Sequence, residues 1–180
     1  MQLHILEEEK DRFYEQLQTE VEGLSHHDLV IVMGDLNAKV GNNNSFYNRE
    51  MGTHSCGVMN ENWERLADFC ALNNLVIGGT LFYHHDIHKL TWYLPNNRDG
   101  NQIDHLLICG KWRRSLQNVR VRRGADVCSD HQLVVPNVKL KLKRQNTENK
   151  TIRKYNVDRL AEAGTKTNFS LELRNRFQAL

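Results

Sequence analysis

An acid and an amide stand two positions apart just after an apolar run near the start of the chain. The run LVIVM, residues 29–33, is typical of a buried strand, and Gly34, Asp35 and Asn37 follow it. Alternation along a strand would place Asp35 and Asn37 on one face, where they could hold a metal ion, a water molecule or a phosphate. Gly, Asp and Asn are also common turn residues, so this segment alone leaves both interpretations open and favours the turn.

Polar side chains interrupt two later apolar runs in the same manner. Asp104 lies inside QIDHLLI, where a buried carboxylate is costly unless it is paired or hydrogen-bonded. Asp130 and His131 come immediately before the apolar residues of CSDHQLVV. A lone acid at a strand start is usually a cap or a surface residue. Because the pattern recurs at the ends of several predicted strands, the three segments together favour a functional site.

Helical spacing predicts two helices in the first half of the chain. Residues 7–24 form an amphipathic helix whose apolar face would contain Phe13, Leu17, Val21 and Leu24. Residues 60–75 form a second helix with Asn60 as a plausible N-cap, and its apolar stripe includes Trp63, Leu66, Phe69 and Cys70.

Strands dominate the second half of the chain. The last of them ends in alternating Val, Leu and Lys, which suits an antiparallel strand with one wet face, and Pro136 places it at an edge or a bulge. From residue 144 the sequence turns polar, and residues 169–180 could form a short final helix. This order of elements predicts an α+β protein with helices packed outside a sheet or paired sheets. The expected strands are residues 75–82, 90–95, 102–109, 118–123 and 130–143.

The motifs GDLN, QIDHLLI and SDHQLV, in this order, resemble the endonuclease/exonuclease/phosphatase superfamily. The resemblance is strongest to the endonuclease domains of LINE-type (non-LTR) retrotransposons and to their cellular relatives, the craniofacial development protein 2-like proteins. It runs from about Met1 to the end of the chain and includes NENWERLADFC and the tail YNVDRL.

The resemblance implies a fold and a chemistry. The fold would be part of a four-layer α/β/β/α sandwich of the DNase I type, and the chemistry would be phosphodiester hydrolysis of DNA with Mg²⁺ or Mn²⁺. Asp35 would position or deprotonate the attacking water, and Asn37 would donate to the phosphate. His131 would stabilise or protonate a phosphate oxygen, Asp104 would orient His131, and Asp130 would lie at the metal or its water shell. Carboxylates suit such a hard, oxygen-seeking cation.

The resemblance also implies an upstream half with an Asn motif and a Glu motif that supplies a principal metal ligand. The glutamates of LEEEKDRF do not replace that motif. We therefore expect residues 1–143 to be a truncated domain that lacks its N-terminal half, and residues 144–180 to be a polar linker with a short helical tail. The chain would be a fragment of a longer retrotransposon reading frame, followed there by a reverse transcriptase, or would pair with a chain that supplies the missing half.

Other functions remain open at this point. The chain could be a catalytically inactive remnant that acts as an interaction module, or a phosphatase or lipid phosphodiesterase of the same fold. His84 and His88 in HHDIH have the spacing of a helical zinc site, but their context favours a surface loop.

The basic segment KWRRSLQNVRVRR, residues 111–123, is a candidate contact to a phosphate backbone. A solvated strand face explains the alternating arginines equally well. Trp92 could stack on a base or belong to the core. The candidate nucleic-acid contacts are Trp92, Arg113, Arg114, Arg120 and Arg122.

The composition of the 180 residues limits the possible surroundings of the chain. The net charge of +2 is too small to establish a polyanion partner by itself. No apolar run approaches the roughly 20 residues of a membrane span, so no membrane partner is expected. The four cysteines are scattered without a C-x-x-C pair, which favours a reducing, intracellular location, nuclear or cytoplasmic. They are Cys56, Cys70, Cys109 and Cys128.

Overall fold

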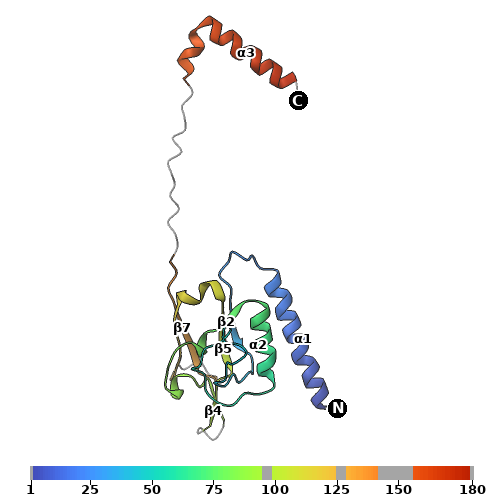
Figure 1. The fold of residues 1–180 in the computed structure, drawn as a ribbon, viewed down its shortest axis with the longest axis vertical. Coiled ribbons are helices and arrows are strands. Elements are labelled where there is room, and N and C mark those ends of the chain that lie inside the picture. Colours follow the sequence, from blue (N-terminus) through green and yellow to red (C-terminus); the bar gives the residue numbers. More distant parts are fainter. Residues whose placement is uncertain (1, 95–98, 125–128, 142–155, 179–180) are drawn as a thin grey trace. The chain divides into compact units, whose positions relative to one another are not determined.

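The computed structural model describes residues 2–94, 99–124, 129–141 and 156–178 (Figure 1). The chain divides into two compact units, Met1–Lys141 and Leu142–Leu180. The second unit contains a short 3₁₀ helix, η4 (Val157–Ala161), and the helix α3 (Ala163–Gln178), which starts earlier than the predicted final helix. Cys128 and most of the predicted polar linker lie outside the described residues.

Two helices pack together in the first unit. They are α1 (Gln2–Glu22) and α2 (Asn62–Leu72). The buried aromatic residue of α1 is Tyr14, whereas Phe13 and Leu24 are 45% and 48% exposed, so the predicted apolar face was wrong at those two positions. The face is set by Tyr14, Leu17 and Val21, whose spacing of three and four residues matches one side of a helix.

An ion-pair network joins these two helices at the surface. Arg65 of α2 contacts two acids of α1 through separate nitrogens of its guanidinium group. The distances are 2.6 Å from Nε to Asp11 Oδ1 and 2.7 Å from Nη2 to Glu7 Oε2. Such forked contacts suit the planar guanidinium group and fix the relative orientation of the helices.

The central sheet consists of three antiparallel strands in the order β1-β5-β2. Their bounds are β1 (Ile31–Asp35), β5 (Asp104–Cys109) and β2 (Leu75–Ile77). Alternate residues of β5 face different layers: Leu107 packs with α1 and α2, whereas Leu106 and Ile108 pack toward the last strand pair. The helices therefore cover one face of the sheet and the strand pair covers the other (Figure 1).

The strand pair is β6 (Leu116–Arg122) with β7 (Leu133–Val138), joined in an antiparallel register. Pro136 lies opposite Val119 in this two-stranded sheet, which confirms its predicted place on an edge strand. The last strand was predicted over residues 130–143, but among the described residues β7 covers only Leu133–Val138. Lys139 N–H still donates to Ser115 O at 2.8 Å, but the partner strand has no further residues beyond that point.

The remaining strands form a hairpin of β3 (Trp92–Tyr93) with β4 (Gly100–Asn101), much shorter than the predicted strand over residues 90–95. Two 3₁₀ turns precede it, η1 (Gly78–Thr80) and η2 (Asp86–His88), and a third, η3 (Gly110–Ser115), links β5 to β6.

Gly52 marks a close approach between two backbone segments. Its N–H donates to Thr80 Oγ1 at 2.8 Å, and a Cβ atom at position 52 would collide with the Thr80 carbonyl oxygen. A Cβ atom added at Gly34, on β1, would have no neighbouring atom within 4 Å.

We expect Gly52→Ala to lower the free energy of unfolding by about 1–3 kcal/mol, as overpacking does, and Gly34→Ala to change it by no more than about 0.5 kcal/mol. Urea unfolding measures both, and equal losses would contradict this account.

Candidate active site

Two acidic residues are paired in the register of the first and fifth strands. Asp35 is the last residue of β1, Asp104 is the first residue of β5, and the antiparallel register makes them direct partners. Side chains at such positions lie about 4.5–5.5 Å apart at Cβ, and like charges there destabilise a sheet. A positive or proton-donating group beside them is therefore required.

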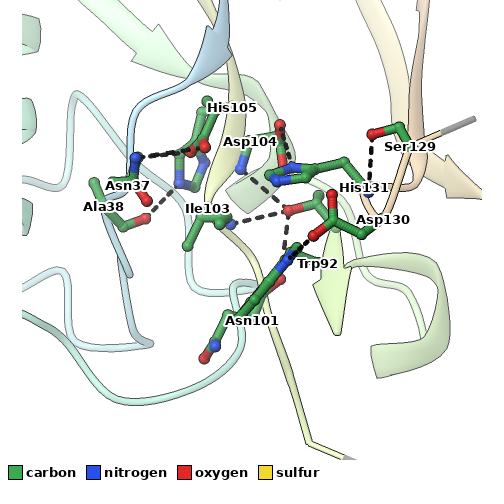
Figure 2. Close-up of polar contacts among 12 residues, drawn as sticks. Asn37, Ala38, Trp92, Asn101, Ile103, Asp104, His105, Ser129, Asp130 and His131 are labelled. Atoms are coloured by element: carbon green, nitrogen blue, oxygen red, sulfur yellow. Dashed lines mark hydrogen bonds and ion pairs between the residues drawn. The ribbon is translucent and has the colours of Figure 1, made fainter. Parts of the chain in front are cut away.

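His131 supplies that group. Its Nδ1 lies 2.9 Å from Asp104 Oδ2 and 3.2 Å from Oδ1, and Figure 2 shows the ring facing the carboxylate. An ionised carboxylate only accepts hydrogen bonds, so Nδ1 carries the proton and Nε2 is the atom that a reactant would meet.

The surroundings of the ring decide its charge. Partial burial lowers the pKa of His131, but the hydrogen bond that Nδ1 donates to Asp104 and the negative charges of Asp104, Asp35 and Asp130 outweigh it. The pKa of His131 is consequently raised above its ordinary value, and the charged imidazolium is favoured.

Thr91 forms hydrogen bonds to the backbone on both sides of this pair. Its Oγ1 accepts the backbone N–H groups of Ile103 at 3.0 Å and Asp104 at 3.1 Å. Its carbonyl oxygen accepts Gln132 N–H at 2.6 Å, next to His131. One buried threonine thus joins the segments that carry both members of the pair. Sequence reasoning missed Thr91, because a lone hydroxyl in an apolar run carries no distinct signal.

Trp92 holds the carboxylate that was predicted to lie at the metal. The indole Nε1–H donates to Asp130 Oδ2 at 2.8 Å, and this bond is the main cause that lowers the pKa of Asp130 (Figure 2). Trp92 also forms an isolated antiparallel bridge with His131. It is half-buried, so it is neither a fully buried core residue nor a fully exposed stacking surface.

Asn37 lies beyond the end of β1, so it does not share a strand face with Asp35 as alternation suggested. Its backbone N–H donates to Asp35 Oδ1 at 2.9 Å, and its Nδ2 lies 3.4 Å from Asp35 Oδ2. The φ angle of Asn37 is +49°, a left-handed conformation that asparagine adopts more readily than most residues. The turn is therefore the means by which the amide is placed beside the acid.

The candidate basic contacts separate into two groups. Arg113 and Arg114 are exposed on η3, which follows the end of β5, whereas Asp104 begins that six-residue strand. A strand of that length spans about 20 Å, so these two arginines are not gathered at the carboxylate pair. Arg120, on β6, lines a small cavity that Asp104 also lines, and Arg122 is exposed further along the same strand.

The donor set of this site suits an oxygen-seeking cation without forming a complete cage. Among the described residues, no three His, Cys, Asp or Glu side chains are grouped so that they could hold a metal ion. Mg²⁺ commonly uses only one or two carboxylates and completes its shell with water and substrate phosphates.

His84, considered above for zinc, instead pairs its Nε2 with Asn118 Oδ1 at 2.7 Å.

Comparison with known proteins places this arrangement in a family. The sequence profile described as "Endonuclease/Exonuclease/phosphatase family" matches residues 2–131. The chain belongs to the endonuclease/exonuclease/phosphatase family. The match covers Asp35, Asp104 and His131, and members of the family generally depend on divalent metals.

Two curated relatives carry the name craniofacial development protein 2. The protein from Tragulus javanicus is 41% identical over 136 residues, which is 73% of this chain and 23% of that protein. The protein from Bos taurus is 40% identical over 136 residues, 73% of this chain and 22% of that protein. The chain spans less than a quarter of the length of these relatives, and they confirm the predicted resemblance to this group.

Solved structures confirm the predicted DNase I-like fold class. The 3'-5' exonuclease NExo from Neisseria meningitidis aligns with a TM-score of 0.53 and 16% identity, over 74% of this chain and 54% of that one. The endonuclease domain of TRAS1, a telomere-specific non-LTR retrotransposon, aligns with a TM-score of 0.50 and 17% identity, over 73% of this chain and 52% of that one.

None of the described helices is long and apolar enough to cross a membrane.

The pairing of His131 with Asp104 predicts a measurable titration. We expect Asp104→Asn to lower the pKa of His131, because it removes the hydrogen-bonded charge that raises it. An NMR titration of the imidazole resonances measures this shift. Asp86→Asn is the matched control, since Asp86 pairs with Lys89 and not with His131. A His131 titration that stays unchanged in Asp104→Asn would contradict the pairing.

The same pair links stability to pH. Because the folded-state pKa of His131 is raised, the stabilisation from the pair is fully present below the ordinary value of 6.5 and is lost as pH rises through the folded-state pKa. We expect the stability gap between the unsubstituted chain and Asp104→Asn to shrink in that window. Urea unfolding at a series of pH values tests this, and a gap that grew with pH would have the wrong sign.

Proposed function

We propose that this chain hydrolyses phosphodiester bonds of DNA by direct attack of water on phosphorus. The observation that carries the proposal is the pairing of His131 with Asp104 directly across the sheet from Asp35. A phosphodiester needs a positive donor for a developing oxyanion and a carboxylate to position water, and this arrangement offers both.

Four residues each have a part in the proposed reaction. Asp35, at the exposed end of β1, accepts a proton from the attacking water or orients it. Asn37 directs its carboxamide N–H toward a phosphate oxygen. The charged ring of His131 donates from Nε2 to a phosphate oxygen or to the leaving oxygen. Asp104 holds the tautomer that makes Nε2 available and favours the charged form of the ring.

The ion that we propose is Mg²⁺, with Mn²⁺ as a substitute, and Asp130 would contribute to holding it. When bound, the ion would supply positive charge at the non-bridging phosphate oxygens. The exposed carboxylate of Asp130 keeps one oxygen for this purpose, since Trp92 donates to the other.

The proposed substrate follows from the structural neighbours, an exonuclease and a retrotransposon endonuclease domain. Trp92, Arg120 and Arg122 would contact the DNA near the site, and Arg113 with Arg114 would contact it farther away. An intracellular location, nuclear or cytoplasmic, suits a DNA substrate. A reverse transcriptase as partner stays a prediction that rests on the resemblance.

A second candidate is a binding module that retains the motifs without turnover. The specific observation in its favour is that the described side chains do not converge as three ligands on one metal ion. Such a module would bind DNA weakly and would not respond to Mg²⁺.

Nicking of supercoiled plasmid distinguishes these functions. With Mg²⁺, we expect the chain to nick the plasmid, and we expect His131→Ala and Asp35→Ala each to slow the reaction by about 10²–10⁴-fold, the usual contribution of a general acid or base. Agarose gels over a time course, with and without chelator, measure the rates.

His27→Ala is the matched control, because His27 is exposed in the connection between α1 and β1. It should nick at the unsubstituted rate. Absence of nicking by a chain that unfolds cooperatively would support the binding module instead. Release of inorganic phosphate from a nucleotide monoester or a phosphoinositide, without nicking, would move the substrate to the phosphatase class.

A further inference from the structure

The three carbonyl groups that follow β1 each accept a hydrogen bond from a side chain elsewhere in the fold. The donors are two asparagines at the start of α2 and one histidine on β5. We call these donors, Asn60, Asn62 and His105, the carbonyl clamp. The bonds run from Asn62 Nδ2 to Leu36 O at 2.6 Å, from Asn60 Nδ2 to Asn37 O at 2.8 Å, and from His105 Nε2 to Ala38 O at 2.7 Å.

The clamp connects the two halves of the candidate site. His105 is the next residue after Asp104, and Figure 2 shows its ring reaching the carbonyl of Ala38, the next residue after Asn37. Asn60 was predicted to be the N-cap of α2, but the N-cap is Glu61. The Oδ1 of Asn60 instead accepts Lys39 N–H at 2.9 Å, so one amide brackets the turn from both sides.

Two members of the clamp are buried and are hydrogen-bonded through their donor atoms but not through their acceptor atoms. Asn62 is 6% exposed and His105 is 3% exposed. Within the described part of the chain, Asn62 Oδ1 and His105 Nδ1 are buried without a hydrogen-bond partner. Burying such acceptors is costly, and apolar side chains of similar size would avoid the cost. The bonds to the turn are the compensation.

Burial favours the neutral form of the histidine in the clamp. Burial, the largest cause, lowers the pKa of His105 below its ordinary value, despite its hydrogen bond and the nearby acids. The neutral form of the ring is therefore favoured, and its Nε2 donates to the carbonyl of Ala38.

We propose that the carbonyl clamp consists of positioning residues that hold Asn37 in its left-handed conformation and so keep the carboxamide beside Asp35. A non-glycine residue at positive φ is less stable than the extended or helical alternatives and persists only where its surroundings enforce it. Three bonds to consecutive carbonyls restrain the backbone of the turn. The consequence for catalysis rests on the function proposed above, whereas the consequence for the turn does not.

Hydrogen exchange tests the turn directly. In Asn60→Ala and His105→Phe, we expect the Asn37 amide, measured by NMR, to exchange about tenfold faster, the equivalent of one net hydrogen bond. His105→Gln should exchange more slowly than His105→Phe, because a glutamine amide can donate to the same carbonyl. The Val121 amide, in the ladder between β6 and β7, should not change and reports on global unfolding.

Asn73→Ala is the matched control. It removes a half-buried side-chain amide at the other end of α2, which bonds to Gln18 and to Phe69 O. It should leave exchange at Asn37 unchanged. Unchanged exchange at Asn37 in the Asn60→Ala chain would overturn the proposal, and this variant alone decides the question if a substitution of His105 prevents folding.

A double-mutant cycle on plasmid nicking tests the catalytic consequence. If the clamp acts through Asn37, then Asn60→Ala should slow nicking in the unsubstituted chain but should cause no further loss in the Asn37→Ala chain. Losses that multiply would show that Asn60 acts through general structure and would overturn its positioning role. If the unsubstituted chain does not nick, the proposed function fails, while the exchange experiment still decides whether the clamp holds the turn.

Discussion

The antiparallel register between β1 and β5 is the constraint on which the rest of the site depends. It sets Asp35 directly opposite Asp104 at the rim of the sheet. A slip of one residue would turn every side chain of β1 to the other face and would separate the two acids. The register is fixed because β5 is buried on both faces, by the helices on one side and by β6 with β7 on the other. Packing of the apolar core thus determines the spacing of the charged groups.

Two acids held together need a compensating group, and the chain brings it from a distant segment. His131 is 27 positions from Asp104 and arrives through the bridge to Trp92 and the bond from Gln132 to Thr91. The same charges that would repel across the sheet raise the pKa of His131. The negative charges of the acid pair therefore favour the charged form of the His131 ring, which is the form suited to a phosphate.

The apolar runs 29–33 and 102–109 predicted the strands β1 and β5. Residues 105–108 of β5 are buried, whereas β1 has no buried residue and Met33 is 66% exposed, so the predicted burial of the first strand was wrong. The acids Asp35 and Asp104 lie at the ends of these strands and are direct partners in the register. The family was predicted because its motifs are local. The predictions that failed depend on contacts between distant segments. Phe13 and Tyr14 are aromatic neighbours, and although Phe13 is the more apolar of the two, it is Tyr14 that is buried against Phe69 of α2.

The function of Asn60 was beyond sequence reasoning for the same reason. An asparagine ahead of a helix is most often a cap, and nothing local shows that its amide faces a turn more than twenty positions earlier. Thr91 and His105 are similar cases, since each bonds to the backbone rather than to a motif side chain. A hydrogen bond to a backbone group does not restrict the type of residue that supplies this group, so the sequence gives no sign of the bond.

The acid and amide that follow the first apolar run form a turn that is also part of the candidate site. A strand would place Asn37 on the same face as Asp35 but about 7 Å farther along. By leaving the strand at Asp35, the chain folds the amide back, and the N–H of Asn37 fixes one carboxylate oxygen at 2.9 Å. A carboxylate held in this way loses less conformational freedom when it engages a reactant, so the left-handed residue gives order to the site before any substrate arrives.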